Sequence, residues 1–447
     1  MLDPKVFKAY DVRGVHPTQL DEEGAYRIGR AYVEEFEPST IAVGRDMRLS
    51  APTMAAALIE GAADGGADVL DLGLVGTEMV YYAVGELGLD GGVCVTASHN
   101  PKEYTGMKIV RRGALPVGGD SGLDDVRRRA EQGFGNVVRR GTVRAEDVWD
   151  GFVDKVVSFV DTERIAPLKV VVDAANGMAG TMLPPVLERL PQLDVVRCYF
   201  EPDGSFPNHE PNPLLPENRE FIVRKTLEEG ADLGVAFDGD ADRCFFVDDT
   251  GEFVPGDFAT ALFAQGVLEK EPGATVIYDV RASWAVPETI ERAGGTAVVN
   301  RVGHAFIKER MREVGAAFAG EVSGHYYFRE FSQADTGVVP FLVMLERISK
   351  GGTKLSQLLR PFRDRYFITG ELNTPVADVS AKLAELEERF GPEGTVSHLD
   401  GLSVEAADWH FNVRPSNTEP LLRLNLEARS QERMERRRDE VLAAIRA

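Results

Sequence analysis

The stretch Leu168-Lys169-Val170-Val171-Val172-Asp173-Ala174-Ala175-Asn176-Gly177-Met178-Ala179-Gly180 decides the fold. It begins as a near-continuous apolar run, passes through a polar loop, and leads into a helical pattern that continues to about Leu190. A second strand is expected from Asp194 to Tyr199. This order of strand, charged loop, helix and strand is typical of a β-α-β unit in a buried, mostly parallel sheet.

The same order occurs twice more along the chain. In the first copy, the helix is expected to begin near Ser50, with Ser50 as its cap and Pro52 in its first turn. In the last copy, the helix is expected to end at Ala293, before two glycines. The first strand and the loop after it are expected at 40–46 in one copy and at 275–283 in the other, and the second strand at 68–73 and 296–299. Three copies predict three α/β domains related by internal duplication.

Shifts in composition predict the domain boundaries. A charged, glycine-containing run at 127–144 precedes a helix expected to start near Ala145, and a turn at 248–252 ends the second copy. Past Pro361 the pattern changes to a charged helix from Val379 to Phe390, several strands, and a closing helix from about Ser430. The expected domains are three α/β domains with mixed sheets at 1–144, 145–250 and 251–365, and a smaller α+β domain at 366–447.

Composition narrows the function classes. The chain has 447 residues, of which 43% are hydrophobic, so it can bury several cores. A net charge of −22 argues against nucleic acid as a partner, because nucleic-acid modules usually carry a basic face. Cys94, Cys198 and Cys244 lie far apart in apolar runs and are expected to be buried free thiols. No signal region or membrane-spanning run is evident, so no membrane association and a cytoplasmic location are expected.

The first stretch with chemical groups is Val95-Thr96-Ala97-Ser98-His99-Asn100-Pro101. It follows an apolar strand expected at 91–95, and a proline cannot continue a strand ladder, so Ser98 should lie on the turn after that strand. There a ligand can reach its hydroxyl, with the imidazole of His99 beside it. The alternative is an ordinary Ser/Thr or Asx turn that satisfies its own backbone.

The second stretch carries three carboxylates at alternate positions, Asp238, Asp240 and Asp242, between apolar strands. Carboxylates so close together raise one another's pKa unless a cation lies among them. Oxygen ligands without His or Cys suit Mg²⁺, which readily takes a phosphate oxygen as a further ligand. Arg243 would add a fixed positive charge. The alternative is an acidic surface turn.

Two later loops carry polar groups. Glu321 and Ser323 stand at positions i and i+2, so on an extended segment they would share one side and could bind neighbouring sugar hydroxyls, although a turn or a helix cap is equally compatible. The stretch from Asn412 to Pro420 combines an arginine, hydroxyls and an amide in a proline-bounded loop, which favours phosphate binding over a plain polar loop.

These four loops, in this order, resemble those of the α-D-phosphohexomutase superfamily, and most closely its phosphomannomutase/phosphoglucomutase group. The resemblance covers essentially the whole chain. It implies four domains around a central cleft and reversible phosphoryl transfer between C1 and C6 of a mannose or glucose phosphate. The reaction would pass through a phosphoserine and a hexose 1,6-bisphosphate, with Mg²⁺ as cofactor and hexose phosphates as the partners of a monomer or homodimer.

The resemblance also implies roles for particular residues. Ser98 would carry the phosphoryl group, and Lys108, matching a lysine that the family carries in a loop, would act with His99 in proton transfer. The stretch around Arg13, taken alone, favours an ordinary surface arginine. The resemblance instead implies that Arg13 contacts the sugar phosphate. The implied catalytic residues are Ser98, His99, Lys108 and Arg243; the implied metal ligands are Ser98, Asp238, Asp240 and Asp242; the implied substrate-binding residues are Tyr10, Arg13, Arg281, His304, Glu321, Ser323, Arg414, Ser416, Asn417 and Thr418.

Alternatives remain for both the sugar and the activity. Val322, between Glu321 and Ser323, is apolar, as in the mannose and glucose enzymes of the family, whereas the glucosamine enzymes tend to carry glutamine. Phosphoglucosamine mutase therefore ranks second. A Mg²⁺-dependent sugar phosphatase has little use for a separate phosphate cradle, and the intact Ser98 and carboxylates argue against a non-catalytic sugar-phosphate sensor.

Overall fold

The computed structural model describes residues 3–135, 137, 139–416 and 421–447. The chain forms two compact units. The first comprises Met1–Phe253 and Ser323–Leu355, and the second comprises Val254–Val322 and Ser356–Ala447. Within the described residues, no helix is both long and apolar enough to cross a lipid bilayer.

The first unit begins with a mixed sheet in the strand order β1-β5-β4-β2-β3-β7. Strand β2 is parallel to β3 and β4, whereas β5 runs antiparallel to β4 and β1. The strands are β1 (Val12–Val15), β2 (Thr40–Arg45), β3 (Asp68–Leu74), β4 (Gly91–Val95), β5 (Tyr104–Arg111), β6 (Leu115–Pro116) and β7 (Val143–Ala145). The helices are α1 (Glu22–Phe36), α2 (Ala51–Gly65), α3 (Thr77–Glu86) and α4 (Leu123–Gln132).

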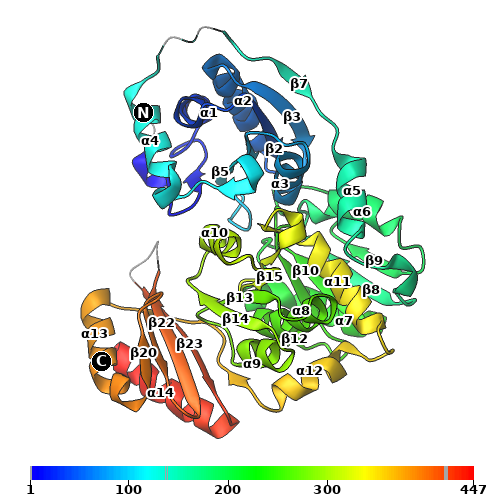
Figure 1. Ribbon diagram of the computed structural model, residues 1–447, viewed down its shortest axis with the longest axis vertical. Helices are drawn as coiled ribbons and strands as arrows, with labels where there is room; N and C mark the ends of the chain where they lie inside the picture. Colours follow the sequence, from blue (N-terminus) through cyan, green and yellow to red (C-terminus); the bar gives the residue numbers. More distant parts are fainter. Residues whose placement is uncertain (1–2, 136, 138, 417–420) are drawn as a thin grey trace. The chain divides into compact units, whose positions relative to one another are not determined.

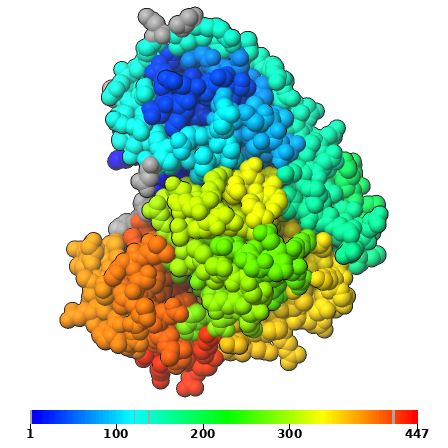
Figure 2. All heavy atoms as spheres, viewed as in Figure 1, coloured from blue at the N-terminus to red at the C-terminus, as the bar shows by residue number. Residues whose placement is uncertain are grey.

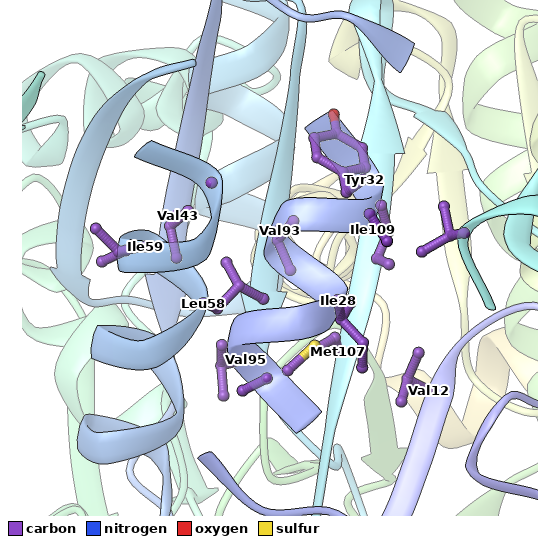
Figure 3. Close-up of a cluster of buried hydrophobic side chains, with 14 of the residues drawn as sticks. Val12, Ile28, Tyr32, Val43, Leu58, Ile59, Val93, Val95, Met107 and Ile109 are labelled. Carbon is purple, nitrogen blue, oxygen red and sulfur yellow. The ribbon is translucent and has the colours of Figure 1, made fainter. Parts of the chain in front are cut away.

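The core of this domain lies between its sheet and the helices α1 and α2 (Figure 3). Ile28 and Tyr32 project from α1, and Leu58 projects from α2, toward buried side chains of the strands. The Tyr32 hydroxyl donates a hydrogen bond to the carbonyl of Val110 at 3.0 Å, so the one polar group of this cluster is satisfied. These contacts anchor β4 and β5, the strands that flank the Ser98 loop.

A second sheet of the first unit contains the order β11-β10-β8-β9. Strand β10 is parallel to β8 and antiparallel to β11, so the carboxylate loop lies in the β10–β11 connection. The elements of this part are α5 (Trp149–Val157), β8 (Lys169–Asp173), α6 (Ala179–Leu187), β9 (Asp194–Cys198), α7 (Pro216–Glu229), β10 (Leu233–Phe237) and β11 (Cys244–Val247). The first unit also holds β16 (Tyr326–Phe328) and β17 (Ala334–Asp335), which pair with each other outside this sheet, and α11 (Val338–Ser349).

The second unit holds the third repeat and the C-terminal domain (Figure 1). The third repeat comprises α8 (Gly256–Lys270), β13 (Thr275–Asp279), α9 (Ala285–Arg292), β14 (Thr296–Asn300), α10 (His304–Val314) and β15 (Phe318–Gly320), with β13 parallel to β14 and β15. The element α12 (Leu355–Arg363) leads to the C-terminal domain.

The C-terminal domain is an antiparallel sheet in the order β18-β23-β22-β21-β20, with β19 also pairing β23. Its strands are β18 (Phe367–Ile368), β19 (Leu372–Pro375), β20 (Thr395–Ser397), β21 (Leu402–Glu405), β22 (Trp409–Pro415) and β23 (Leu421–Ala428), and its helices are α13 (Val379–Phe390) and α14 (Gln431–Arg446). The atoms of this part, orange to red in Figure 2, gather in one continuous body. The predicted smaller α+β domain is confirmed.

Each predicted repeat forms a parallel β-α-β unit, and the predicted helix from Val379 to Phe390 is confirmed. One local prediction is wrong, because Ala145 ends the edge strand β7, which pairs with β3, and the next helix begins at Trp149. The predicted helix start is confirmed, with Ser50 at the N-cap position and Pro52 in the first turn, but the Ser50 side chain makes no capping hydrogen bond, because its backbone is already helical and not extended. The four domain boundaries stay a prediction.

The three cysteines are free and buried, as predicted.

We expect Gly61→Ala to destabilise the first domain. A Cβ at Gly61 would lie 2.0 Å from the carbonyl oxygen of Tyr26, and one at Gly29 would lie 2.3 Å from that of Leu58, so α1 and α2 touch through their backbones. Separating the helices should cost about 1–3 kcal/mol in the free energy of unfolding, measured by urea denaturation. The control is Gly266→Ala on α8, where a Cβ meets nothing within 4 Å. Equal stability of the two variants would contradict the close contact.

Candidate active site

The Ser98 turn follows β4 directly. Ser98 has a left-handed backbone with φ of 48°. Its N–H donates to the Thr96 hydroxyl at 2.8 Å, so Thr96 satisfies the turn backbone and the Ser98 hydroxyl is left for another partner. That hydroxyl donates to Oδ2 of Asp238 at 2.7 Å, and Nδ1 of His99 lies 3.2 Å from it. The turn therefore presents Ser98 to the carboxylate loop.

Arg48 holds this turn in place, which the sequence did not indicate. Its buried guanidinium donates to the carbonyl oxygens of Ser98 and Asn100, at 2.8 and 2.6 Å, and to those of Pro101 and Tyr104. Burial lowers the pKa of Arg48, and the nearby carboxylate of Asp46 counters that effect. A single cation thus fixes the carbonyls around the serine.

The carboxylate loop is fully buried. Asp238, Asp240 and Asp242 each have 0% exposure, and one oxygen from each lies within 4.8 Å of the others. Nε of Arg243 donates to Asp238 at 2.8 Å. Nζ of Lys108 donates to Asp240 at 2.7 Å and also to Asp242. Two cations therefore compensate three carboxylates. Lys108 lies within strand β5, so the loop position implied for it is wrong.

Burial and charge shift the pKa values here in different directions. Burial raises the pKa of Asp238 and, with the charge of Asp240, raises that of Asp242 well above its usual range. For Asp240, burial is outweighed by the ammonium of Lys108, which holds its pKa well below the usual range. Burial, with the charge of Arg243, lowers the pKa of His99 well below its usual range, so its imidazole is neutral at pH 7.

The carboxylate set fits a hard divalent cation. Oδ1 of Asp240 and Oδ1 of Asp242 are buried and have no hydrogen-bond partner among the described residues. Unpaired buried oxygens are costly, and an all-oxygen donor set is the kind that Mg²⁺ prefers. The alternative of an acidic surface turn is therefore wrong, and the predicted metal-binding triad is present.

Several neighbours of this loop escaped sequence reasoning. Thr77, the first residue of α3, donates from its hydroxyl to Oδ2 of Asp240 at 2.5 Å. Glu78 is fully buried, and burial raises its pKa well above the usual range. His325 and Asp335 form a second potential metal-binding group with Asp242. Thr77 and Glu78, at the start of a helix, belong to no recognisable motif, whereas His325 stands two positions after Ser323, where its imidazole was a usable signal.

The N-terminal residues lie in the first unit. Arg13 in β1 donates from Nε to Asp11 and from Nη1 to Asn100, both at 2.9 Å. Its side chain is only 11% exposed, so the surface position favoured by its own stretch is wrong. Tyr10 is half-buried in the bend that precedes β1. Arg13 is thereby linked to the Ser98 turn through Asn100.

Ser323 lies in a turn and not in the extended segment expected for it. Its hydroxyl is 3.0 Å from Nδ1 of His325. The glycine at 324, with φ of 82°, and the turn at Val322 bend the chain before the next strand, so the i and i+2 argument does not apply.

The second unit contains a separate set of charged residues. Arg281 donates from Nε and Nη2 to the two oxygens of Asp279 at 2.8 and 2.9 Å. Its guanidinium also lies 3.8 Å from Glu321, which accepts the N–H of Gly303 at 2.9 Å. Burial opposes ionisation of Arg281, but Asp279 outweighs it and raises the pKa. His304, the first residue of α10, is buried.

Arg414 lies in β22, opposite Arg423 of β23. The two guanidiniums donate to the carboxylate of Glu371 at 2.9 and 3.0 Å, and Nη2 of Arg423 is 3.4 Å from Oγ of Ser416. Glu371 and Arg423 were not predicted from the sequence. Asn417 and Thr418 lie outside the described residues.

Models of one protein family match the chain along its length. The descriptions are phosphoglucomutase/phosphomannomutase alpha/beta/alpha domain I at residues 4–133, domain II at 150–251, domain III at 255–366, and C-terminal domain at 371–444. A phosphomannomutase from Salmonella montevideo is 45% identical over 98% of both chains. One from Escherichia coli K12 is 44% identical over 95% of this chain and 94% of its own.

A solved structure agrees with these matches. A phosphoglucomutase/phosphomannomutase family protein from Burkholderia thailandensis superposes with a TM-score of 0.90 at 33% identity, over 99% of this chain and 97% of its own. The fold, the buried triad and these relatives define a phosphohexomutase, an isomerase of carbohydrate metabolism. The chain belongs to the phosphoglucomutase/phosphomannomutase family.

We expect Thr77→Val to cost about 1–3 kcal/mol in the free energy of unfolding, because valine keeps the volume but removes the hydroxyl that donates to the buried Asp240, which then keeps only the ammonium of Lys108 as a side-chain donor among the described residues. Thr53→Val is the control, since Thr53 donates at 2.6 Å to Glu22 on an exposed surface and should change stability by less than about 0.5 kcal/mol. Thermal denaturation compares them. Similar losses in both variants would argue against a special role of the buried hydroxyl.

Proposed function

We propose that this phosphohexomutase moves a phosphoryl group reversibly between C1 and C6 of mannose or glucose phosphate, through a phosphoserine at Ser98 and a hexose 1,6-bisphosphate. The observation that carries the proposal is the Ser98 hydroxyl, held 2.7 Å from Asp238 and 3.5 Å from Nη2 of Arg243. A nucleophile beside a buried cation is what phosphoryl transfer requires.

The described side chains support each part of this chemistry. Arg243 and Lys108 carry positive charge toward the place where negative charge would gather on the phosphoryl oxygens. The neutral imidazole of His99, with Nδ1 3.2 Å from the Ser98 hydroxyl, can accept a proton there. Asp238 already accepts the hydroxyl hydrogen bond, which orients the Ser98 oxygen.

Ser98, Asp238, Asp240 and Asp242 would hold Mg²⁺. When bound, Mg²⁺ supplies charge neutralisation for the phosphoryl group. The buried, unpaired oxygens of Asp240 and Asp242 support this assignment.

The remaining residues would bind substrate. We propose that Arg414 and Ser416, together with Asn417 and Thr418, hold the phosphate that is not reacting, and that Arg281 supplies a further positive charge for substrate binding. Glu321 and Ser323 would bind sugar hydroxyls, and Tyr10, Arg13 and His304 would contact the sugar phosphate. Such a division of labour suits a bisphosphate that leaves Ser98, turns around and presents its other phosphate. A monomeric or homodimeric state and a cytoplasmic location stay predictions.

Two observations support mannose and glucose phosphates as the substrates. Val322 is apolar, which favours mannose and glucose over glucosamine. Relatives at 45%, 44% and 41% identity carry the name phosphomannomutase, which supports mannose phosphate as a substrate.

We expect phosphorus NMR to show conversion of mannose and glucose 1-phosphates, but not glucosamine 1-phosphate, into 6-phosphates in the presence of Mg²⁺ and a trace of hexose 1,6-bisphosphate. Ser98→Ala should lower turnover by about 1000-fold or more while sparing substrate binding, because it removes the nucleophile. Full mutase activity in that variant would refute the role of Ser98. Release of inorganic phosphate by the wild type would instead indicate a phosphatase.

Removal of divalent cations should abolish activity reversibly. We expect a chelator to stop turnover and added Mg²⁺ to restore it, because two ammonium or guanidinium groups alone leave the three carboxylates under-compensated. Asp242→Asn should require more Mg²⁺ for half-maximal activity, whereas Asp203→Asn, at a half-buried aspartate of the first unit whose carboxylate accepts the N–H of Ser205, should not. Full activity in the presence of chelator would rule out the metal.

A further inference from the structure

Three arginines of the second unit converge on one carboxylate, that of Glu371. Nη2 of Arg414 lies 2.9 Å from one oxygen of Glu371, and Nη1 of Arg423 lies 3.0 Å from the other. Nη1 of Arg281 lies 3.8 Å away. Two forked donors around two oxygens is also the arrangement in which arginines hold a phosphate monoester.

The strand register explains why an anion is needed there. Arg414 and Arg423 are direct partners in the antiparallel pair β22–β23, so their side chains leave the same face. Like charges at directly opposed positions destabilise a sheet. Glu371 immediately precedes β19, whose first residue Leu372 pairs with Leu424 of β23, and this pairing brings the carboxylate to the two arginines.

Three arginines and three carboxylates of the second unit lie together around Glu371, and their charges cancel. Arg281, Arg414 and Arg423 each carry a positive charge, and Asp279, Glu321 and Glu371 can each carry a negative one. Burial works to raise the pKa of Glu371, but the charges of the arginines outweigh it and hold the pKa below its ordinary value. The carboxylate is therefore ionised at neutral pH, and an incoming phosphate meets an anion already seated on its arginines.

The carboxylate of Glu371 is exposed enough to move away from the arginines. The side chain of Glu371 is 25% exposed and that of Arg423 is 30% exposed, whereas Arg281 is only 6% exposed. Nε of Arg414 has no hydrogen-bond partner among the described residues, so Glu371 does not use all of its donors. A partly exposed carboxylate can turn toward water without the cost of a fully buried ion.

We propose that Glu371 is an internal counter-anion that takes the place of the substrate's non-reacting phosphate on Arg414 and Arg423 whenever that phosphate leaves. The inference rests on the proposed function, in which Arg414 holds this phosphate. Exchange of one anion for another keeps the opposed arginines compensated throughout, which lowers the barrier for a bisphosphate to leave the cluster and turn around. Glu371 thereby sets how tightly the phosphate is held.

The test is Glu371→Gln, which keeps the shape but removes the charge. We expect KM for mannose 1-phosphate and the inhibition constant of inorganic phosphate each to fall about 5-fold, because phosphate no longer competes with a carboxylate. kcat should fall as well, because release before reorientation becomes slower. If Glu371 merely braced the arginines, KM and the inhibition constant would rise, and that result would overturn the exchange.

Glu393→Gln is the matched control. Glu393 pairs with Arg437 in the same domain, and its loss should leave KM, kcat and phosphate inhibition unchanged. A second readout does not need turnover: inorganic phosphate should raise the melting temperature more in Glu371→Gln than in the wild type. An equal or smaller rise of the melting temperature in Glu371→Gln would overturn the proposed exchange of Glu371 for phosphate.

Arg414→Ala separates the two proposals. Weaker phosphate inhibition in Arg414→Ala, with no change in Glu371→Gln, would overturn the exchange alone. Unchanged phosphate inhibition in Arg414→Ala would overturn the phosphate-binding role of Arg414, and with it the exchange.

Discussion

The burial of three carboxylates on one short loop is the constraint on which the first unit depends. Asp238, Asp240 and Asp242 are all removed from water, and isolated ions in such a place would cost many kcal/mol. Lys108 and Arg243 offset that cost only if their nitrogens lie within hydrogen-bond distance of the oxygens. Strands β5, β10 and β11 must therefore assemble together, and the same assembly brings the Ser98 hydroxyl to Asp238.

The two sheets of the first unit are coupled by this network. Lys108 belongs to the first sheet and the carboxylates to the second, and Thr77 adds a hydroxyl donor from the start of α3. A buried network is stabilising when all its members are satisfied and costly when one is missing. The precise placement of a nucleophile thus follows from electrostatics that the fold needs in any case, and α1 and α2 support it by packing behind β4 and β5.

Repeats and loops were predictable because they follow from local patterns: apolar runs predict strands, and glycine and proline mark their ends. Helix α13 was therefore placed correctly at both ends. What depended on distant partners was not predictable. The resemblance implied a loop position for Lys108, but it lies in β5, which pairs with β4, and Ala145 belongs to a strand only because β3 offers a free edge. Glu371 carries no motif, since its arginines lie more than forty positions away in the chain.

Each of the two charged clusters contains a residue of opposite charge. In the first unit a protein cation, Lys108, lies among carboxylates, and in the second a protein anion, Glu371, lies among arginines. Each group lowers the net charge of its cluster without any ligand, and such local compensation matters in a chain with a net charge of −22 that is to bind dianions. Uncompensated arginines would bind phosphate tightly and release it slowly. A mutase that works through a bisphosphate must release one phosphate from these arginines and bind the other in every turnover, so an internal competitor favours turnover over affinity.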